Sequence, residues 1–190
     1  MVVIAVLIAV LVIGIVYAVG LYNGLVALRQ RVRQAWANID VLLKQRHDEL
    51  PKLIEACKRY MQYEQETLER VMRARGAVQA ARSGSDVGAL GAAEQELRSG
   101  IGRLFALVEN YPQLKADESF RSLQTRITGL EESIADRREL YNEQVQINNT
   151  RIEQFPAVLI ARRYGFGPAQ LLQFAAEEKG DVDVGAMFGR

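Results

Sequence analysis

Side chains that bind metals or form disulfides are nearly absent from this sequence. Its 190 residues include one cysteine and one histidine. A disulfide framework, a Cys/His zinc cluster and a di-iron bundle with paired Glu-x-x-His motifs each need at least two such side chains, so all three are excluded. We therefore expect no metal and no cofactor.

An excess of charge of one sign is also missing. The 24 Lys and Arg residues nearly balance the 23 Asp and Glu residues, which leaves a formal net charge of +1. Such a chain has no overall field that would attract nucleic acid, so we expect no nucleic-acid partner. Four prolines in a sequence rich in Ala, Leu, Glu, Gln and Arg favour an all-helical fold over a mixed sheet.

No charged side chain precedes Arg29, and residues 2–21 (VVIAVLIAVLVIGIVYAVGL) are almost continuously apolar. As a helix this segment is about 30 Å long, the thickness of the hydrocarbon core of a bilayer. The alternative is a cleaved signal peptide, because residues 18–20 (AVG) resemble a processing site. No Lys or Arg precedes the segment, and it is longer than the ~7–15 apolar residues of a signal peptide, so we favour a retained transmembrane helix.

Positive charge directly after the apolar segment predicts its orientation. Arg29, Arg31 and Arg33 follow the span, whereas no Lys or Arg precedes it. Because positively charged flanks stay in the cytoplasm, we expect the N-terminus outside and the remaining chain in the cytoplasm. Tyr17 and Tyr22 are then expected near the inner headgroup layer, which suits amphipathic rings.

Apolar residues recur at spacings of three and four from Leu25 to Leu42, so we expect the span to continue as the first helix of the soluble region. This helix should end near Arg46. Asp48 is suited to cap a second helix, with Pro51 in its first turn. A backbone N–H there has no acceptor within the helix, so the N–H that proline lacks is not missed. The apolar spacing extends this second helix to about Arg82.

Residues 83–88 are small or polar and predict a turn. A third helix should stop at Tyr111, because the residue before Pro112 disfavours the helical conformation. A fourth helix is expected over residues 117–153. The predicted fold is all-α, with an N-terminal transmembrane helix that continues into an antiparallel, up-down bundle of four long helices.

We expect three parts in the chain: a transmembrane anchor over 1–22, a cytoplasmic bundle over 23–155, and a membrane-proximal C-terminal segment with a tail over 156–190. Short connections would place the turns near 47–50 and 112–117 at the end of the bundle far from the membrane, here called the distal end.

The predicted second and fourth helices, about 50 and 55 Å long, exceed the roughly 37 Å of the first helix below the membrane. Their other ends should therefore reach the headgroups. Contacts with anionic lipid headgroups are predicted for Arg73, Arg75, Arg82, Arg162 and Arg163. Residues 155–174 combine apolar residues with two Arg and no acid, which is typical of an interfacial segment, although a tail packed on the bundle fits as well.

Several short motifs occur in a fixed order: residues 21–26 (LYNGLV), 35–40 (AWANID), 50–53 (LPKL) and 109–116 (ENYPQLKA). The residues that carry them, together with two later pairs, are Tyr22, Asn23, Trp36, Asp40, Pro51, Asn110, Tyr111, Pro112, Tyr141, Asn142, Phe155 and Pro156. In this order and spacing they resemble the LemA family of bacterial membrane proteins, over residues 21 to 167.

The resemblance implies a bacterial inner-membrane protein with a short external N-terminus, a single span and a cytoplasmic antiparallel helical bundle. It implies no established catalytic activity. Residues 168–190 differ from the Pro-rich, Phe-terminated ends associated with many family members.

Single residues suited to chemistry have structural interpretations here. His47 is expected near a helix end or on the surface rather than in acid–base or metal chemistry, and Cys57 as a buried hydrophobic residue rather than a nucleophile. Glu64, Glu109 and Glu131 are expected to form buried ion pairs across helices, with Arg137 or Arg138 as partners. This interpretation is favoured over a catalytic pair of carboxylates. Amide hydrogen bonds across helices are expected from Asn23, Asn38, Asn142, Asn148 and Asn149.

The function predicted from these features is a non-enzymatic membrane scaffold that self-associates on the cytoplasmic face and organises lipid or membrane proteins. The alternative is an adaptor that presents a membrane protease or signalling partner through the distal surface near Tyr111 to Lys115. An enzyme is disfavoured because the sequence has no nucleophile–base pair, phosphate-binding loop or metal cluster.

Overall fold

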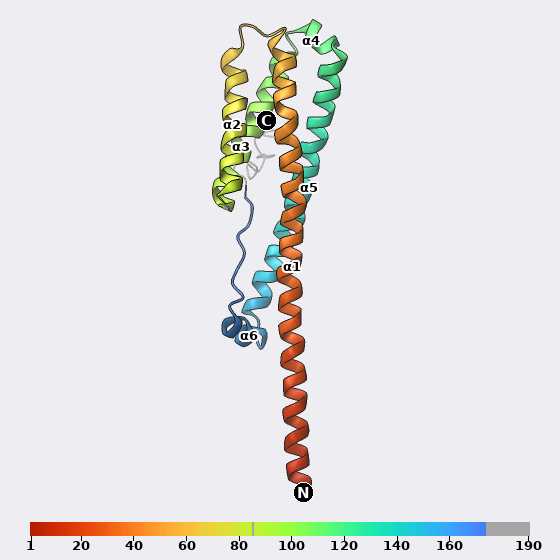
Figure 1. Cartoon of the computed structure of the whole chain (residues 1–190), viewed down its shortest axis with the longest axis vertical. Coiled ribbons are helices and arrows are strands. Elements are labelled where there is room, and N and C mark those ends of the chain that lie inside the picture. Colours follow the sequence, from red (N-terminus) through yellow and green to blue (C-terminus); the bar gives the residue numbers. More distant parts are fainter. Residues whose placement is uncertain (85, 174–190) are drawn as a thin grey trace, which may run out of the picture.

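The computed structural model describes residues 1–84 and 86–173. The elements within them are helical, and the all-α prediction is confirmed (Figure 1). They are α1 (Val2–Lys58), α2 (Gln65–Ser83), α3 (Val87–Val108), α4 (Pro112–Ala116), α5 (Glu118–Glu153) and α6 (Ala157–Tyr164).

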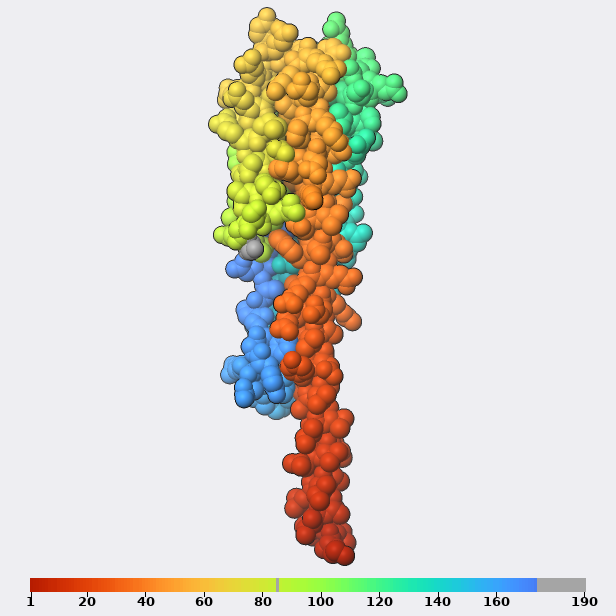
Figure 2. Space-filling model, in the orientation of Figure 1, coloured from red at the N-terminus to blue at the C-terminus, as the bar shows by residue number. Residues whose placement is uncertain are grey.

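Helix α1 has 57 residues, and its N-terminal part projects from the body as a single rod (Figure 2). This part is long and apolar enough to cross a membrane, and none of its apolar window is buried against the rest of the described chain. Exposed Val, Leu and Ile side chains cover the rod on every side. In water such a surface would be very unfavourable, whereas in a bilayer it is fully solvated.

The predicted break between a first and a second helix at residues 47–50 is wrong. Helix α1 continues through Pro51 and ends at Lys58, so the distal turn lies at residues 59–64. Proline at position 51 leaves the carbonyl of His47 without its usual helical donor. The Nε of Arg75, on α2, donates to this carbonyl at 2.9 Å, which compensates for the missing hydrogen bond.

As a consequence, α2 has only 19 residues and is much shorter than predicted. Helices α2 and α3 form a hairpin beside the distal part of α1, and its lower end lies at the level of Asp40, above the middle of α1 (Figure 1). The later helices agree better with the sequence. Asp86 and Asp117 cap α3 and α5 by accepting hydrogen bonds from the backbone N–H groups of Ala89 and Phe120, each at 3.0 Å.

Two apolar clusters hold the elements together. The main core lies between the α1–α5 antiparallel pair and the α2–α3 hairpin, and includes fully buried Leu50, Leu104 and Phe120. A smaller cluster joins the base of α1 to α5 and α6, and contains Leu25, Ile152, Ala157, Ala161 and Phe166. The base of the bundle is therefore packed separately from its distal part.

Residues 165–173 follow α6 without helical structure, and residues 167–173 are called the strap below. Gly165 ends α6 with a φ of 70°, a left-handed conformation that glycine adopts without strain. From there the strap rises from α6 toward the lower end of α3 (Figure 1).

Candidate membrane-proximal and distal sites

Helix α6 lies beside α1 at the point where the apolar rod ends. The rings of Tyr164 and Phe166 contact the ring of Tyr22 edge-on, with centroid separations of 5.1 and 5.6 Å. The guanidinium carbon of Arg29 lies 4.8 Å from the centroid of the Phe166 ring, a cation–π distance. These contacts fix residues 155–166, called the foot below, at the level of Tyr22.

The outer side of the foot combines exposed apolar and basic side chains. Phe155 is 80% exposed, Leu159 is 60% exposed, and Arg162 and Arg163 are also exposed. The sequence has no Asp or Glu between residues 154 and 173. An apolar surface flanked by arginines is suited to the boundary between headgroups and acyl chains. The foot therefore packs on the bundle, as one of the two sequence interpretations expected. The interfacial interpretation stays a prediction.

The structure does not bring the other predicted headgroup residues to this level. Arg82 pairs with both carboxylate oxygens of Asp40, with Nη2 to Oδ2 at 3.0 Å. Asp40 lies about 27 Å further along α1 than Tyr22, at ~1.5 Å per residue. Arg73 and Arg75 are closer still to the distal end. The predicted second helix was too long, and for that reason its three arginines were wrongly expected at the headgroups. The headgroup prediction remains only for Arg162 and Arg163.

The pairing of Arg82 with Asp40 affects the titration of Asp40. The hydrogen bond from Arg82 lowers the pKa of the Asp40 carboxyl below its ordinary value, although partial burial opposes the shift. Asp40 belongs to one of the motifs singled out from the sequence. Its role in the structure is to fix the lower end of the α2–α3 hairpin against α1.

A buried ion triad joins three helices at mid-height. Arg46 of α1 donates from Nη2 to Glu94 of α3 at 2.5 Å and from Nη1 to Glu131 of α5 at 2.7 Å. The side chains of Arg46 and Glu94 are 1% and 2% exposed. Burial raises the pKa of Glu94, and the adjacent Arg46 charge opposes that shift.

The sequence indicated Glu131 as a buried ion-pair residue but missed Arg46 and Glu94. Arg46 was expected at a helix end, where an arginine is normally solvated. The other two predicted acids make different contacts: Glu64 accepts a hydrogen bond from the Tyr111 hydroxyl at 3.3 Å, and Glu109 forms an exposed pair with Lys115 at 2.5 Å.

The two isolated reactive side chains are structural. Cys57 is buried in the main core, and burial raises the pKa of its thiol to about 12, so it is not a thiolate nucleophile at neutral pH. His47 lies inside α1, not at a helix end, and burial lowers the pKa of its imidazole. No group of three or more His, Cys, Asp or Glu residues suited to a metal occurs in residues 1–84 and 86–173.

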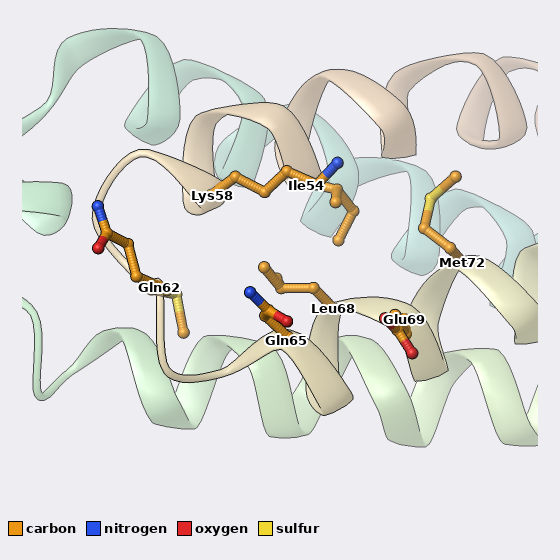
Figure 3. A pocket seen from close by; sticks show the side chains of 8 residues that line it. Ile54, Lys58, Gln62, Gln65, Leu68, Glu69 and Met72 are labelled. Carbon is orange, nitrogen blue, oxygen red and sulfur yellow. The ribbon is translucent and has the colours of Figure 1, made fainter.

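A cavity of about 480 Å³ opens at the distal end between the last turn of α1 and the first turns of α2 (Figure 3). Ile54, Leu68 and Met72 form its apolar lining, and Lys58, Gln65 and Glu69 are at its rim. Tyr111 joins the segment before α4 to the segment before α2 at this end. Its ring packs on the main core, and its hydroxyl donates a hydrogen bond to Glu64. The cavity is large enough for one or two apolar side chains of another molecule.

Two of the predicted asparagines have an unexpected partner. Asn142 and Asn149 do not bond another helix; each binds the backbone of the strap. Tyr141, whose ring lies 5.4 Å from that of Trp36, also donates from its hydroxyl to the strap at Gln170. Sequence periodicity did not reveal these contacts because the strap has no periodic pattern of its own.

The apolar rod, the continuous helix and the packed foot define a membrane-associated, all-helical bundle protein. Residues 35–185 match the LemA family, and the chain belongs to that family. The family resemblance seen in the sequence motifs is thereby confirmed.

Curated relatives of the chain include magnetosome proteins. Magnetosome protein MamQ 2 of Paramagnetospirillum magneticum is 34% identical over 73 residues, which cover 38% of this chain and 27% of that protein. Magnetosome protein MamQ of Magnetospirillum gryphiswaldense is 26% identical over 117 residues, which cover 62% of this chain and 42% of the relative. The chain thus matches less than half the length of each of these relatives.

Proposed function

We propose that this protein is a non-enzymatic scaffold of the bacterial inner membrane. It crosses the membrane once and stands its bundle on the cytoplasmic face. In this proposal, copies associate with each other and organise lipid or other membrane proteins. The names of the family and of its magnetosome relatives are not those of enzymes, which agrees with a structural role.

The foot is the observation that carries the proposal. It lies beside Tyr22, at the end of the apolar rod, and exposes Phe155, Leu159 and two arginines. Arg29, Arg31 and Arg33 follow Tyr22 on α1, Arg29 contacts Phe166 of the foot, and their positive charge favours a cytoplasmic position for the foot. A protein held at both the span and the foot has a fixed height and tilt on the membrane, as a scaffold requires.

Depth-dependent fluorescence quenching tests the foot. The full chain with Trp36→Phe and Leu159→Trp is reconstituted into vesicles whose acyl chains are brominated, and bromine quenches tryptophan only within the bilayer. Val41→Trp in the same background is the matched control, because Val41 is equally exposed but lies far above the foot. We expect strong quenching at position 159 and little at position 41. Equal, weak quenching at both positions would contradict a foot in the membrane.

A second candidate function is an adaptor for a membrane protease or signalling partner, and the distal cavity favours it. Its apolar lining and charged rim suit an apolar side chain presented by a partner. Crosslinking in membranes followed by purification tests the idea. Two variants change the rim of the cavity, Lys58→Glu and Glu69→Arg, and two change the surface nearby, Tyr111→Ala and Lys115→Glu. Glu118→Arg is the exposed distal control. Recovery of the same partner from every variant would contradict docking at this end.

A further inference from the structure

The strap is held on α5 by two asparagine side chains that each make a pair of hydrogen bonds to one residue. The Asn149 amide accepts from the N–H of Ala169 and donates to its carbonyl, both at 2.9 Å. The Asn142 amide accepts from the N–H of Leu172 at 2.9 Å and donates to its carbonyl at 3.1 Å. Each pair reproduces the bonding that a neighbouring β-strand would supply.

The spacing of the two asparagines matches an extended chain. Asn142 and Asn149 are two helical turns apart on α5, about 10.5 Å. Ala169 and Leu172 are separated by about 10 Å when the strap is extended. The α5 surface is therefore a ready-made site for an extended peptide of either this chain or another.

Two further contacts define which peptide fits. Leu172 is 1% exposed and belongs to the main core, so the site has one apolar socket. Next to it the strap crosses α3 at Gly91, where an added Cβ would lie 2.1 Å from the carbonyl oxygen of Gln173. A glycine is needed there for the strap to fit. The hydrogen bonds to residues 169–172 all go to main-chain atoms, so the site selects an extended segment with leucine at one position.

The strap is joined to the foot by residues that permit a change of direction. Gly165 and Gly167 precede Pro168, and the five residues from Gly165 to Ala169, four steps along the chain, span up to about 14 Å when extended. This distance exceeds the ~10 Å diameter of a helix. A chain that swings outward at Gly165 gives up the contacts of Phe166 with Tyr22 and Arg29, but its strap can then reach past its own α5 to a bundle packed alongside.

We propose that this site, lined by α5 and the start of α3, receives the strap of a second copy of the chain, so that neighbouring copies exchange straps. The inference rests on the self-association in the proposed function and gives it a contact. A strap from another copy makes the same five hydrogen bonds and fills the same leucine socket, so the contact energy lost on exchange is that of Phe166 with Tyr22 and Arg29. Membrane anchoring supports this occupant, because all copies stand parallel and at one height, which brings a neighbour's strap to the asparagines in the correct register.

Crosslinking between differently tagged full-length chains in the membrane tests exchange. One chain carries Gln173→Cys in the strap and the other carries Ala92→Cys beside Gly91. The bismaleimide used is one that links these two cysteines when both are in a single chain. Native Cys57 is buried with a thiol pKa of about 12 and does not compete. A chain with Gln34→Cys on α1 replaces the Ala92→Cys chain as the control for random collision.

We expect a mixed product from the strap and α3 cysteines that exceeds the collision control. Asn149→Ala in the Ala92→Cys chain alone should reduce it about tenfold, because the incoming strap then loses two hydrogen bonds that its own site still supplies. Asn38→Ala, at an exposed position on α1, should leave it unchanged. If oligomers persist but no mixed product exceeds the collision control, exchange is wrong and the proposed function stands. If the chains are also monomeric, the proposed self-association fails as well.

Discussion

Arg46 places a positive charge in the centre of the bundle, where two carboxylates from different helices neutralise it. Such a triad specifies the alignment of α1, α3 and α5 more than it stabilises them, because each charge loses its water on burial. The sequence identified one of the two acids by its position beside the apolar stripe. It could not identify Arg46, since a predicted helix end explained that arginine equally well.

Arg46→Met should destabilise the protein by about 3–5 kcal/mol, because it leaves Glu94 buried without a partner. Adding Glu94→Gln should restore part of the loss by removing the unpaired charge. Urea unfolding followed by circular dichroism measures both variants, with Arg121→Met as the exposed control, expected within about 0.5 kcal/mol of the wild type. Equal stability of Arg46→Met and the wild type would show that the triad is not buried as described.

Asp40 provides a test with pH. Its pKa is lowered by Arg82 in the folded protein, so ionised Asp40 stabilises the fold above the ordinary pKa of 3.8, and this contribution is lost as pH falls below that value. Because the pair is partly exposed, Asp40→Asn should cost under about 1 kcal/mol at pH 7. Comparison of the urea midpoints of wild type and variant at pH 7 and pH 3 should show the difference shrinking at pH 3. A larger difference at pH 3 would be inconsistent with the pairing.

At the scale of elements, Pro51 explains why the sequence was misread. A capping residue followed by a proline in the first turn indicates a helix start, and Asp48 followed by Pro51 fits that pattern. In the structure Leu50, Leu53 and Ile54 are buried on the same side of one helix as Ile39 and Leu43, so packing maintains the helix through the proline. The local cost is compensated from α2, which residue spacing within α1 could not reveal.

A double-mutant cycle tests this compensation. Arg75→Ala should destabilise the wild type by about 1 kcal/mol, since the His47 carbonyl loses its donor. In the Pro51→Ala background the new backbone N–H supplies that donor, so Arg75→Ala should cost much less. The free energies of unfolding of the four proteins give the coupling. Additive effects would indicate that Arg75 does not replace the hydrogen bond removed by the proline.

The later elements were more predictable than the first break. Helix α5 was expected over 117–153 and occupies Glu118–Glu153, because Asp117 caps it and its apolar spacing is regular. For the foot, composition left an interfacial segment and a segment packed on the bundle as alternatives, and the structure shows the packing, against Tyr22 and Leu25. The strap escaped prediction because its bonds are made by its main chain, which composition does not describe.

At the scale of the whole molecule, the chain is a rod with two ends of different character. One end is a bare helix with the foot beside it (Figure 2), apolar along its length and basic at the foot. The other end holds the cavity with its apolar lining and charged rim. The proposed scaffold uses the first end for the membrane and the sides for other copies. The distal tip then remains accessible for partners.

The mass of the full-length particle, extracted from membranes in native nanodiscs and measured over a range of dilutions, tests the scaffold most directly. We predict particles that contain several copies and persist on dilution, with the bundles on one side of the disc. Single copies of 21.3 kDa protein in every disc, at all dilutions, would contradict the account.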